Sequence, residues 1–294
     1  MDKVKLGSNY PEITGNAVFY NHECFSRFGI EVEQVNPPKE GMTLNEALIS
    51  GAVDFTHLLS HPILAAVQGH PVKYIAAYQE DGFEVIARPE IKSMADLNGK
   101  KVSFATPMMN RNFFYAFMRA GGDLSSITLA GYGGQIHQEV MGVAMDDLEY
   151  LRDGRIDAMA LLPPMSSAAM GEGMRSLFRH GDPFPTPVFG LMARDEMIHG
   201  NRELLVGMVA ALKQSIDEYL SDRQFGIELV RRVGTAEEYL ESAYDMTRYQ
   251  MHPLSSLPEF VQREWIENEK QLEQINAAVP LAQVFDFSIV REME

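Results

Sequence analysis

The chain has 294 residues, about twice the size of a typical single domain, so we expect two domains. Its hydrophobic fraction of 46% and charged fraction of 22% exclude a disordered or fibrous chain. Acidic residues outnumber basic ones 41 to 25, and a net charge of −16 argues against nucleic acid or a membrane surface as a partner. The apolar runs are far shorter than the roughly 20 residues that span a bilayer. The single Cys24 excludes an internal disulfide and a multi-cysteine metal site.

The start of the chain leaves two localisations open. Met1 is followed directly by a strand-like run, without the basic start, apolar stretch and cleavage site of a secretory signal. If Met1 is the native start, the protein is cytoplasmic. If the sequence is a mature form to which Met1 was added, the protein is periplasmic.

Short apolar or β-branched runs alternate with helical stretches, which predicts mainly parallel sheets flanked by helices, with right-handed crossovers. From about residue 200 the chain becomes mainly helical. In chain order, the predicted strands are Val4–Leu6, Ile30–Val35, Val53–Thr56, Val72–Ala77, Phe83–Ala87, Lys101–Phe104, Ile156–Ala160 and Pro187–Ala193, and the predicted helices are Asn16–Arg27, Leu44–Ser50, Pro62–Gln68, Phe113–Arg119, Leu148–Asp153, Arg202–Asp222, Gln224–Val233, Ala236–Met246 and Pro258–Asn276.

One helix–glycine–strand pattern occurs twice. Gly51 and Gly154 each follow a predicted helix, where glycine is favoured because it adopts the left-handed conformation without penalty. Asp54 and Asp157 then occupy the same offset in the two following strands. This repetition predicts two similar α/β lobes.

Two strand-like segments are followed by exposed linkers, and we interpret them as the crossings between the lobes. They are Phe83–Ala87 and Pro187–Ala193. Residues 1–88 plus 192–294 would then form a discontinuous first lobe with the C-terminal helices, and residues 89–191 the second lobe. One copy of the repeat falls in each lobe, which is the organisation expected of a two-lobed protein with a cleft between the lobes.

The segments Gly51–Asp54, Ala65–Val72 and Ile91–Val102 resemble the type II periplasmic solute-binding fold, and within it the nitrate/sulfonate/thiamine-pyrimidine (NMT1/THI5-like) subgroup. The third segment contains Asp-Leu-x-Gly-Lys-Lys-Val, which opens the second lobe in such proteins, and the resemblance spans roughly residues 3 to 250. It implies two α/β lobes that close on a small molecule. We expect no cofactor and no metal, because zinc and phosphate-loop motifs are missing from the sequence and its histidines do not cluster at metal-ligand spacing. Ligands of this fold lie at loop tips and helix N-termini, at the carboxyl ends of strands.

In the first lobe, two loops after predicted strands carry candidate ligand-binding residues. Asn9 can donate a hydrogen bond and Tyr10 can stack on a flat ligand. Ser60 and His61 precede Pro62 at the first position of a helix, where free backbone N–H groups hold a carboxylate, sulfonate or phosphate. Histidine adds a group that changes charge between about pH 5 and 8.

In the second lobe, the loop after Lys101–Phe104 holds the matching candidates. Thr106 and Asn110 offer hydroxyl and amide donors, and Arg111 can clamp an anion with two hydrogen bonds. Tyr132 lies in a glycine-rich segment that lacks the dinucleotide fingerprint, and it can provide a stacking surface.

Two further candidates follow the second copy of the repeat. Met165 offers a soft contact for an aromatic or apolar ligand, and Ser166 a hydroxyl group. By contrast, we interpret His57, in an apolar strand, as a core histidine whose hydrogen bonds are satisfied.

The sequence therefore predicts a solute-binding protein that captures a small, flat, anionic molecule of the sulfonate, aromatic carboxylate or pyrimidine type, in an interlobe cleft, for ABC-type uptake with a permease as partner. This function needs no catalytic residue. The alternative is a cytoplasmic enzyme on the same fold that uses His61, either a thiamine-pyrimidine-synthase-like enzyme or a desulfinase- or decarboxylase-like lyase.

Particular residues bear on the enzyme alternative. The spacing around His61 is similar to that around the reactive histidine of the thiamine-pyrimidine synthases, but His57 stands where that family carries its cofactor-bearing lysine, and its cysteine-rich iron-binding motif is absent. The desulfinase resembled here carries its nucleophilic cysteine in the loop after the first strand, where this chain has Ser8, and Cys24 lies inside the next predicted helix. A ligand-sensing regulator would need a DNA-binding segment, and the sequence shows none.

Overall fold

The computed structural model describes residues 1–8, 13–36, 42–58, 62–103, 117–118, 121–130, 147–182, 187–272 and 275–293. The chain divides into two compact units. Unit 1 consists of Met1–Glu80, Pro187–Glu237 and Arg248–Glu294, and unit 2 of Asp81–Thr186 and Glu238–Thr247.

The boundaries of the units differ from the predicted ones at 88/89 and 191/192. The chain enters unit 2 after Glu80, because β5 (Glu84–Ala87) pairs with strands of unit 2. It returns at Pro187, because β10 (Pro187–Arg194) pairs along its length with strands of unit 1. Residues 238–247 also belong to unit 2, although the sequence places them in the first lobe.

Unit 1 is built on a six-stranded sheet in the order β11-β4-β10-β3-β1-β2. Strands β1, β2, β3 and β4 run in one direction, whereas β10 is antiparallel to both of its neighbours and β11 is antiparallel to β4. The strands are β1 (Asp2–Gly7), β2 (Ile30–Val35), β3 (Phe55–Leu58), β4 (Val72–Glu80), β10 and β11 (Met251–Ser255).

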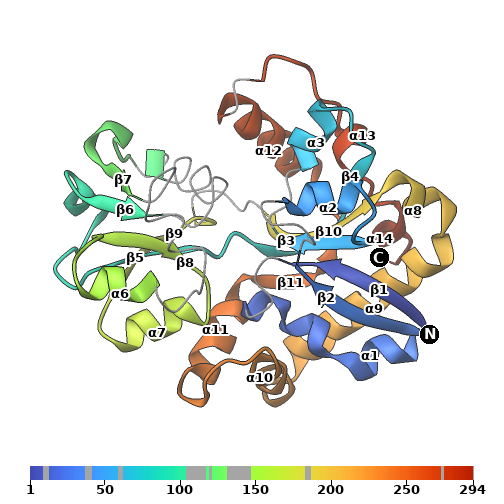
Figure 1. Ribbon diagram of the computed structural model, residues 1–294, viewed down its shortest axis with the longest axis horizontal. Coiled ribbons are helices and arrows are strands. Elements are labelled where there is room, and N and C mark those ends of the chain that lie inside the picture. The colour runs from blue at the N-terminus through green and yellow to red at the C-terminus, as the bar shows by residue number, and fades with distance from the viewer. Residues whose placement is uncertain are drawn as a thin grey trace. The chain divides into compact units, whose positions relative to one another are not determined.

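Helices cover both sides of this sheet, with α2, α3 and α13 on one side and α1 and α9 on the other (Figure 1). The helical elements of unit 1 are η1 (Thr14–Tyr20), α1 (His22–Arg27), α2 (Leu44–Ile49), α3 (Pro62–Val67), α8 (Asp195–Gly200), α9 (Arg202–Ser221), α10 (Arg223–Arg232), α12 (Glu259–Leu272), α13 (Leu281–Val284) and α14 (Ser288–Met293).

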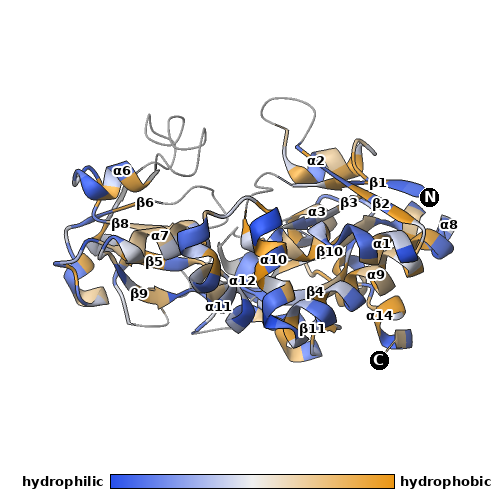
Figure 2. Ribbon diagram, turned by 90° about the horizontal axis from the view of Figure 1, so that it is seen from below, coloured by the Kyte–Doolittle hydropathy of each residue, from blue (hydrophilic) through white to orange (hydrophobic). Residues whose placement is uncertain are grey.

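Local sequence signals explain where these helices begin and end. Thr43 and Glu46 form a capping box at the start of α2, in which the Thr43 side chain accepts from the Glu46 amide and the Glu46 carboxylate accepts from the Thr43 amide. After α2, Gly51 has a φ of 74°, as the sequence predicts for a helix stop. The long helix α9 alternates buried and partly exposed positions, so hydrophobic and hydrophilic residues are both seen along it (Figure 2).

Unit 2 contains a five-stranded sheet in the order β7-β6-β8-β5-β9. Strands β6, β7 and β8 are parallel to one another, and β5 is antiparallel to both β8 and β9. Its elements are β5, η2 (Met94–Leu97), β6 (Lys101–Ser103), η3 (Leu124–Ser126), β7 (Thr128–Ala130), α6 (Asp147–Arg152), β8 (Ala158–Leu161), α7 (Met165–Gly171) and β9 (Arg175–Arg179). The segment η4 (Glu237–Tyr239) and the helix α11 (Leu240–Gln250) contain the boundaries at 237/238 and 247/248.

The prediction of mainly parallel sheets is therefore too simple. Both sheets are mixed, because each contains a strand from the point where the chain crosses between the units, and that strand runs against its neighbours. The helix–strand alternation that predicts parallel pairing holds only for β1, β2 and β3 in unit 1 and for β6, β7 and β8 in unit 2. In the part of the chain that the structure describes, no helix is both long and apolar enough to cross a membrane.

Candidate functional site

One edge of the unit 1 sheet collects the ends of several strands. Gly7, the last residue of β1, pairs with Thr56 of β3. Phe189 of β10 pairs with Leu58 of β3 on one side and with Gln79 of β4 on the other. The carboxyl ends of β1, β3 and β4 and the amino end of β10 therefore meet along one line, the unit 1 edge. In α/β sheets ligands bind beyond such carboxyl ends.

The four candidates of the first lobe belong to the segments that follow β1 and β3. Asn9, Tyr10, Ser60 and His61 lie outside the described residues. Because β1 and β3 are parallel neighbours, the two segments leave the sheet at the same unit 1 edge. The ligand-binding roles of the four residues stay predictions.

The candidates of the second lobe follow strands that are likewise parallel neighbours. Ser103, the last residue of β6, pairs with Met159 of β8. The segments after β6 and β8 therefore leave the unit 2 sheet at one edge. Thr106, Asn110, Arg111 and Tyr132 lie outside the described residues.

Met165 and Ser166, at the start of α7, are described, and both take part in packing. Met165 packs against the apolar cluster of unit 2 that includes Ile86. Ser166 is completely buried, with its hydroxyl oxygen 4.0 Å from the sulfur of Met246, and Ser167 donates to the same sulfur at 3.1 Å. These contacts explain why residues 238–247 belong to unit 2. The predicted ligand contacts of Met165 and Ser166 stay predictions.

The structure adds a group of buried polar side chains at the unit 1 edge. We call this group the edge cluster, and its members are Ser8, Asn16, His57, Tyr78 and Gln79. The Asn16 side-chain amide donates to the Ser8 hydroxyl at 3.5 Å, and Gln79 donates to the side-chain oxygen of Gln250 at 3.1 Å. All five side chains are uncharged at neutral pH, since the pKa of Tyr78 is raised and that of His57 lowered by burial.

His57 is buried as predicted, but the predicted hydrogen bonds are not found within the described ranges. Its ring centroid lies 5.0 Å from that of Phe19 and 6.1 Å from that of Phe189. Neither imidazole nitrogen has a hydrogen-bond partner among the described residues. Burial lowers the pKa of His57 to about 3, so the ring is neutral at physiological pH. The apolar run around His57 signals burial, but sequence carries no signal for the missing partners.

A glycine allows η1 to approach this edge closely. A Cβ atom on Gly15 would lie 2.6 Å from a ring carbon of Phe189 and 2.9 Å from the side-chain oxygen of Gln79. Any side chain at position 15 would force these two residues away. Thr14-Gly15-Asn16 follows the first predicted strand closely, but the sequence gives no sign that it packs against Phe189, far away along the chain.

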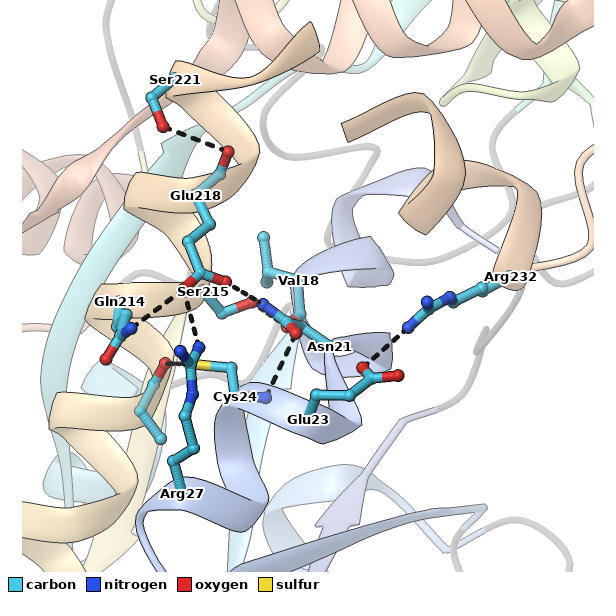
Figure 3. Close-up of polar contacts among 11 residues, drawn as sticks. Val18, Asn21, Glu23, Cys24, Arg27, Gln214, Ser215, Glu218, Ser221 and Arg232 are labelled. Carbon is cyan, nitrogen blue, oxygen red and sulfur yellow. Dashed lines mark hydrogen bonds and ion pairs between the residues drawn. The ribbon is translucent and has the colours of Figure 1, made fainter. Parts of the chain in front are cut away.

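A polar network attaches η1 and α1 to α9 (Figure 3). The Ser215 hydroxyl donates to the Val18 carbonyl at 2.6 Å. Asn21 and Arg27 donate to the two carboxylate oxygens of Glu218 at 2.8 and 2.7 Å. Burial alone would raise the pKa of Glu218, but these hydrogen bonds, with one from Gln214, lower it below its usual value. The network thus holds η1, with Gly15 and Asn16, at the unit 1 edge.

Cys24 is part of the interior and has no feature of a nucleophile. It lies in α1, is fully buried, and its thiol donates to the Ala211 carbonyl at 3.5 Å (Figure 3). Burial raises the pKa of the thiol, which disfavours the reactive thiolate. Across the described ranges, no three histidine, cysteine or carboxylate side chains are grouped so that they could hold a metal ion.

These features define a class of fold: two α/β units, in each of which parallel neighbouring strands end at one edge of a mixed sheet, as in the periplasmic-binding-protein fold. The model of the NMT1/THI5 like family matches residues 11–224, which is more than half of the chain. The chain belongs to the NMT1/THI5-like family.

The chain is similar to curated proteins over only part of their length. A protein of Brucella abortus (strain 2308) named as a binding protein is 24% identical over 196 residues, which cover 64% of this chain and 57% of the relative. A protein of Brucella suis matches over the same share and carries a name of the same kind. The chain thus spans little more than half the length of these relatives.

Solved structures match nearly the whole chain. The periplasmic aliphatic sulphonate binding protein SsuA of Escherichia coli has a TM-score of 0.74 at 20% identity, covering 97% of both chains. The ligand-binding component of an ABC-type import system of Staphylococcus aureus has a TM-score of 0.78 at 15% identity, covering 100% of this chain and 99% of that one. The desulfurization enzyme DSZB has a TM-score of 0.71 at 12% identity, covering 99% and 98%. At these identities the likeness shows the fold.

Proposed function

We propose that the protein is the solute-binding component of an ABC-type importer and that it captures a small, flat, anionic organic molecule of the sulfonate, aromatic carboxylate or pyrimidine type. The observation that carries this proposal is the shared arrangement of the two sheets. In each unit, two parallel neighbouring strands end at one edge and lead into segments that hold the predicted ligand-binding residues. Family membership and the sulphonate-binding protein of the same fold support it.

The proposed binding energy comes from hydrogen bonds and stacking rather than from a buried opposite charge in unit 1. The side chains of the edge cluster are uncharged, and their N–H and O–H donors can hold an anion through hydrogen bonds. On this proposal Tyr10 and Tyr132 stack on the flat part of the solute, and Arg111 provides a cation. A permease is the proposed partner and the periplasm the proposed location, as for the periplasmic relatives of the same fold.

A thermal-shift screen tests this proposal. The purified chain is heated with alkanesulfonates, aromatic sulfonates, aromatic carboxylates and pyrimidines, and each hit is measured by calorimetry. A solute at a hundred times its Kd stabilises the folded state by about 2.7 kcal/mol. Mass spectrometry of the incubated solute should show it unchanged. If no member of the panel raises the midpoint, or a hit is converted into a product, the proposed transport function is wrong.

The second candidate function is an enzyme that uses His61, and the fold shared with the desulfurization enzyme DSZB favours it. If this candidate is right, incubation with an aromatic sulfinate or a pyrimidine yields a new product. His61→Ala should then abolish turnover while the solute still binds. Cys24 is not expected to take part, because its thiol is buried and already donates a hydrogen bond. Turnover that survives His61→Ala would contradict this assignment.

A further inference from the structure

His57 is the member of the edge cluster whose hydrogen-bonding capacity is unused among the described residues. It lies on β3 one residue before the end of the strand, and Phe19 and Phe189 contact its ring. Both nitrogens are buried, and neither has a partner in the part of the chain that the structure describes. A polar group left in this state destabilises a fold. Replacement by an apolar ring of similar size would remove the cost.

The surroundings of the ring indicate what it can bind. The rings beside His57 are those of Phe19 and Phe189, which are apolar, and the other members of the edge cluster are uncharged. A neutral imidazole offers one N–H donor and one nitrogen acceptor. A carboxylate or sulfonate only accepts hydrogen bonds, and it would find no opposite charge on this ring. A hydroxyl or an amide can donate to the acceptor nitrogen of the neutral ring or accept from its N–H, and a heterocyclic nitrogen can accept from the N–H without bringing a charge into this surrounding.

We propose that His57 is a ligand-binding residue that recognises an uncharged polar group of the solute, such as a hydroxyl, amide or ring nitrogen, at the unit 1 edge. This inference rests on the proposed function and narrows it. The solute carries an anionic group together with an uncharged hydrogen-bonding group on a flat ring. Simple anions without the second group bind less tightly.

The inference also explains why a buried histidine is kept where none of the described residues offers it a partner. A site that is built to hydrogen-bond its ligand leaves polar groups unpaired when the ligand is absent. Stability is then lower than it could be, which is a common cost of functional positions. The solute supplies the missing partner when it binds.

Matched probes test the inference directly. Benzenesulfonate, 4-hydroxybenzenesulfonate and 3-pyridinesulfonate share the anion and the flat ring and differ in the uncharged polar group, and benzoate with nicotinate forms a second pair. Calorimetry at pH 7 should show the polar member of a pair binding about tenfold more tightly to the unmodified chain, since one further buried hydrogen bond contributes on the order of a factor of ten.

Three variants separate a ligand contact from a structural role. His57→Phe should abolish the preference for the polar probe and leave the unliganded midpoint of unfolding unchanged or higher. His57→Asn, which keeps a donor and an acceptor, should retain part of the preference, and it also serves if the phenylalanine variant does not fold. His22→Asn changes an exposed histidine of the same unit and should leave the preference unchanged.

The outcomes distinguish this inference from the function on which it rests. If the chain binds sulfonates but shows no preference within a pair, or if His57→Phe keeps the preference, the inference is wrong and the proposed function stands. A hydrogen bond from an imidazole nitrogen to another part of the unliganded chain, observed in a crystal structure, would also overturn it. If no probe or other solute of the screen binds, the proposed function itself fails.

Discussion

The two units are built on the same arrangement of five strands. Read from one side, the orders are β2-β1-β3-β10-β4 in unit 1 and β7-β6-β8-β5-β9 in unit 2, and unit 1 adds β11 at its end. The strand that runs against both of its neighbours is β10 in unit 1, which comes after the chain returns from unit 2, and β5 in unit 2, which is the first strand after the chain enters that unit. The comparison shows that the repeat seen in the sequence corresponds to a repeated three-dimensional frame.

The repeated aspartate has the same structural role in both units. Asp54 accepts a hydrogen bond from the backbone N–H of Lys5 at 2.9 Å, and Asp157 accepts one from Lys101 at 2.9 Å. In both cases the aspartate N–H donates to the carbonyl of the same lysine. The aspartate therefore ties the turn after the helix to the neighbouring strand, which explains why it recurs at a fixed offset from the helix-stop glycine.

An arginine completes the frame at the end of each crossing strand. Arg194 donates to the carbonyls of Leu48 and Val53, which flank the turn containing Gly51. Arg88 lies so close to Gly154 that a Cβ atom there would clash with its guanidinium group. The two glycines share a positive φ, of 74° and 77°, and each turn packs against an arginine.

The units differ at the edges that lead to the predicted ligand loops. Position 57 of β3 is histidine, whereas Ala160 occupies the same offset in β8. The following residue of β3, Leu58, pairs with Phe189, whereas the following residue of β8, Leu161, pairs with Glu84. Burial raises the pKa of Glu84 and lowers the pKa of His57. The frame is common to both units, and the buried titratable groups at the edges are particular to each.

The largest expected effect comes from truncating equivalent positions of the two crossing strands. Met192 of β10 and Ile86 of β5 are buried in the apolar clusters of unit 1 and unit 2. Each substitution to alanine should lower the free energy of unfolding by about 2–5 kcal/mol. Trp265, the single tryptophan, lies in the Met192 cluster, so its fluorescence reports unit 1, whereas far-UV circular dichroism reports both units.

With these two probes, Met192→Ala should lower the denaturant midpoint of Trp265 fluorescence, and Ile86→Ala should lower the circular-dichroism midpoint while fluorescence changes little. If both variants shift both signals equally, the two units unfold as one cooperative body and cannot be compared as separate units.

A smaller effect is expected from removing the repeated aspartate. Asp54→Ala and Asp157→Ala each remove a carboxylate acceptor from a backbone N–H, which should lower the free energy of unfolding by about 1.5–3 kcal/mol. The matched controls Asp54→Asn and Asp157→Asn keep an acceptor oxygen and should lose less. A near-neutral result at one site would show that the shared hydrogen bond is important in only one of the units.

The smallest expected effect is an opposite pH dependence of the two edges. The pKa of His57 falls from its ordinary 6.5 to about 3 on folding, so between these values the unfolded chain binds a proton that the folded chain does not. Unit 1 therefore loses stability as the pH falls below 6.5, by about 2 kcal/mol at pH 5. Comparison with His57→Phe by Trp265 fluorescence isolates this contribution.

Glu84 should act in the other direction. Because burial raises its pKa, the folded chain keeps a proton that the unfolded chain has lost, so its contribution to stability is present at low pH and is lost as the pH rises above the ordinary value of 4.5. Glu84→Gln should remove that part of the pH dependence. Equal pH profiles for the unmodified chain and both variants would contradict the assignment of these groups.

The sequence alone determined the class of fold, the repeat and the principal helices. The helical stretches predicted after residue 200 correspond to α9 and α10, and Gly51 and Gly154 end their helices as expected. These signals can be read from the sequence because they depend on neighbours only a few residues away. The resemblance to the solute-binding family is also read from short segments.

Only the tertiary structure decided which strands pair and what the buried edge contains. Phe83–Ala87 reads as a strand of the first lobe until its partners Ala158–Leu161 and Arg175–Arg179 are known, since pairing depends on residues far away in the chain. The edge cluster is assembled from β1, η1, β3 and β4 by the register of the sheet. In that assembly none of the described residues lies within hydrogen-bonding reach of the His57 nitrogens, because a hydrogen bond is made or missed according to which groups folding brings together.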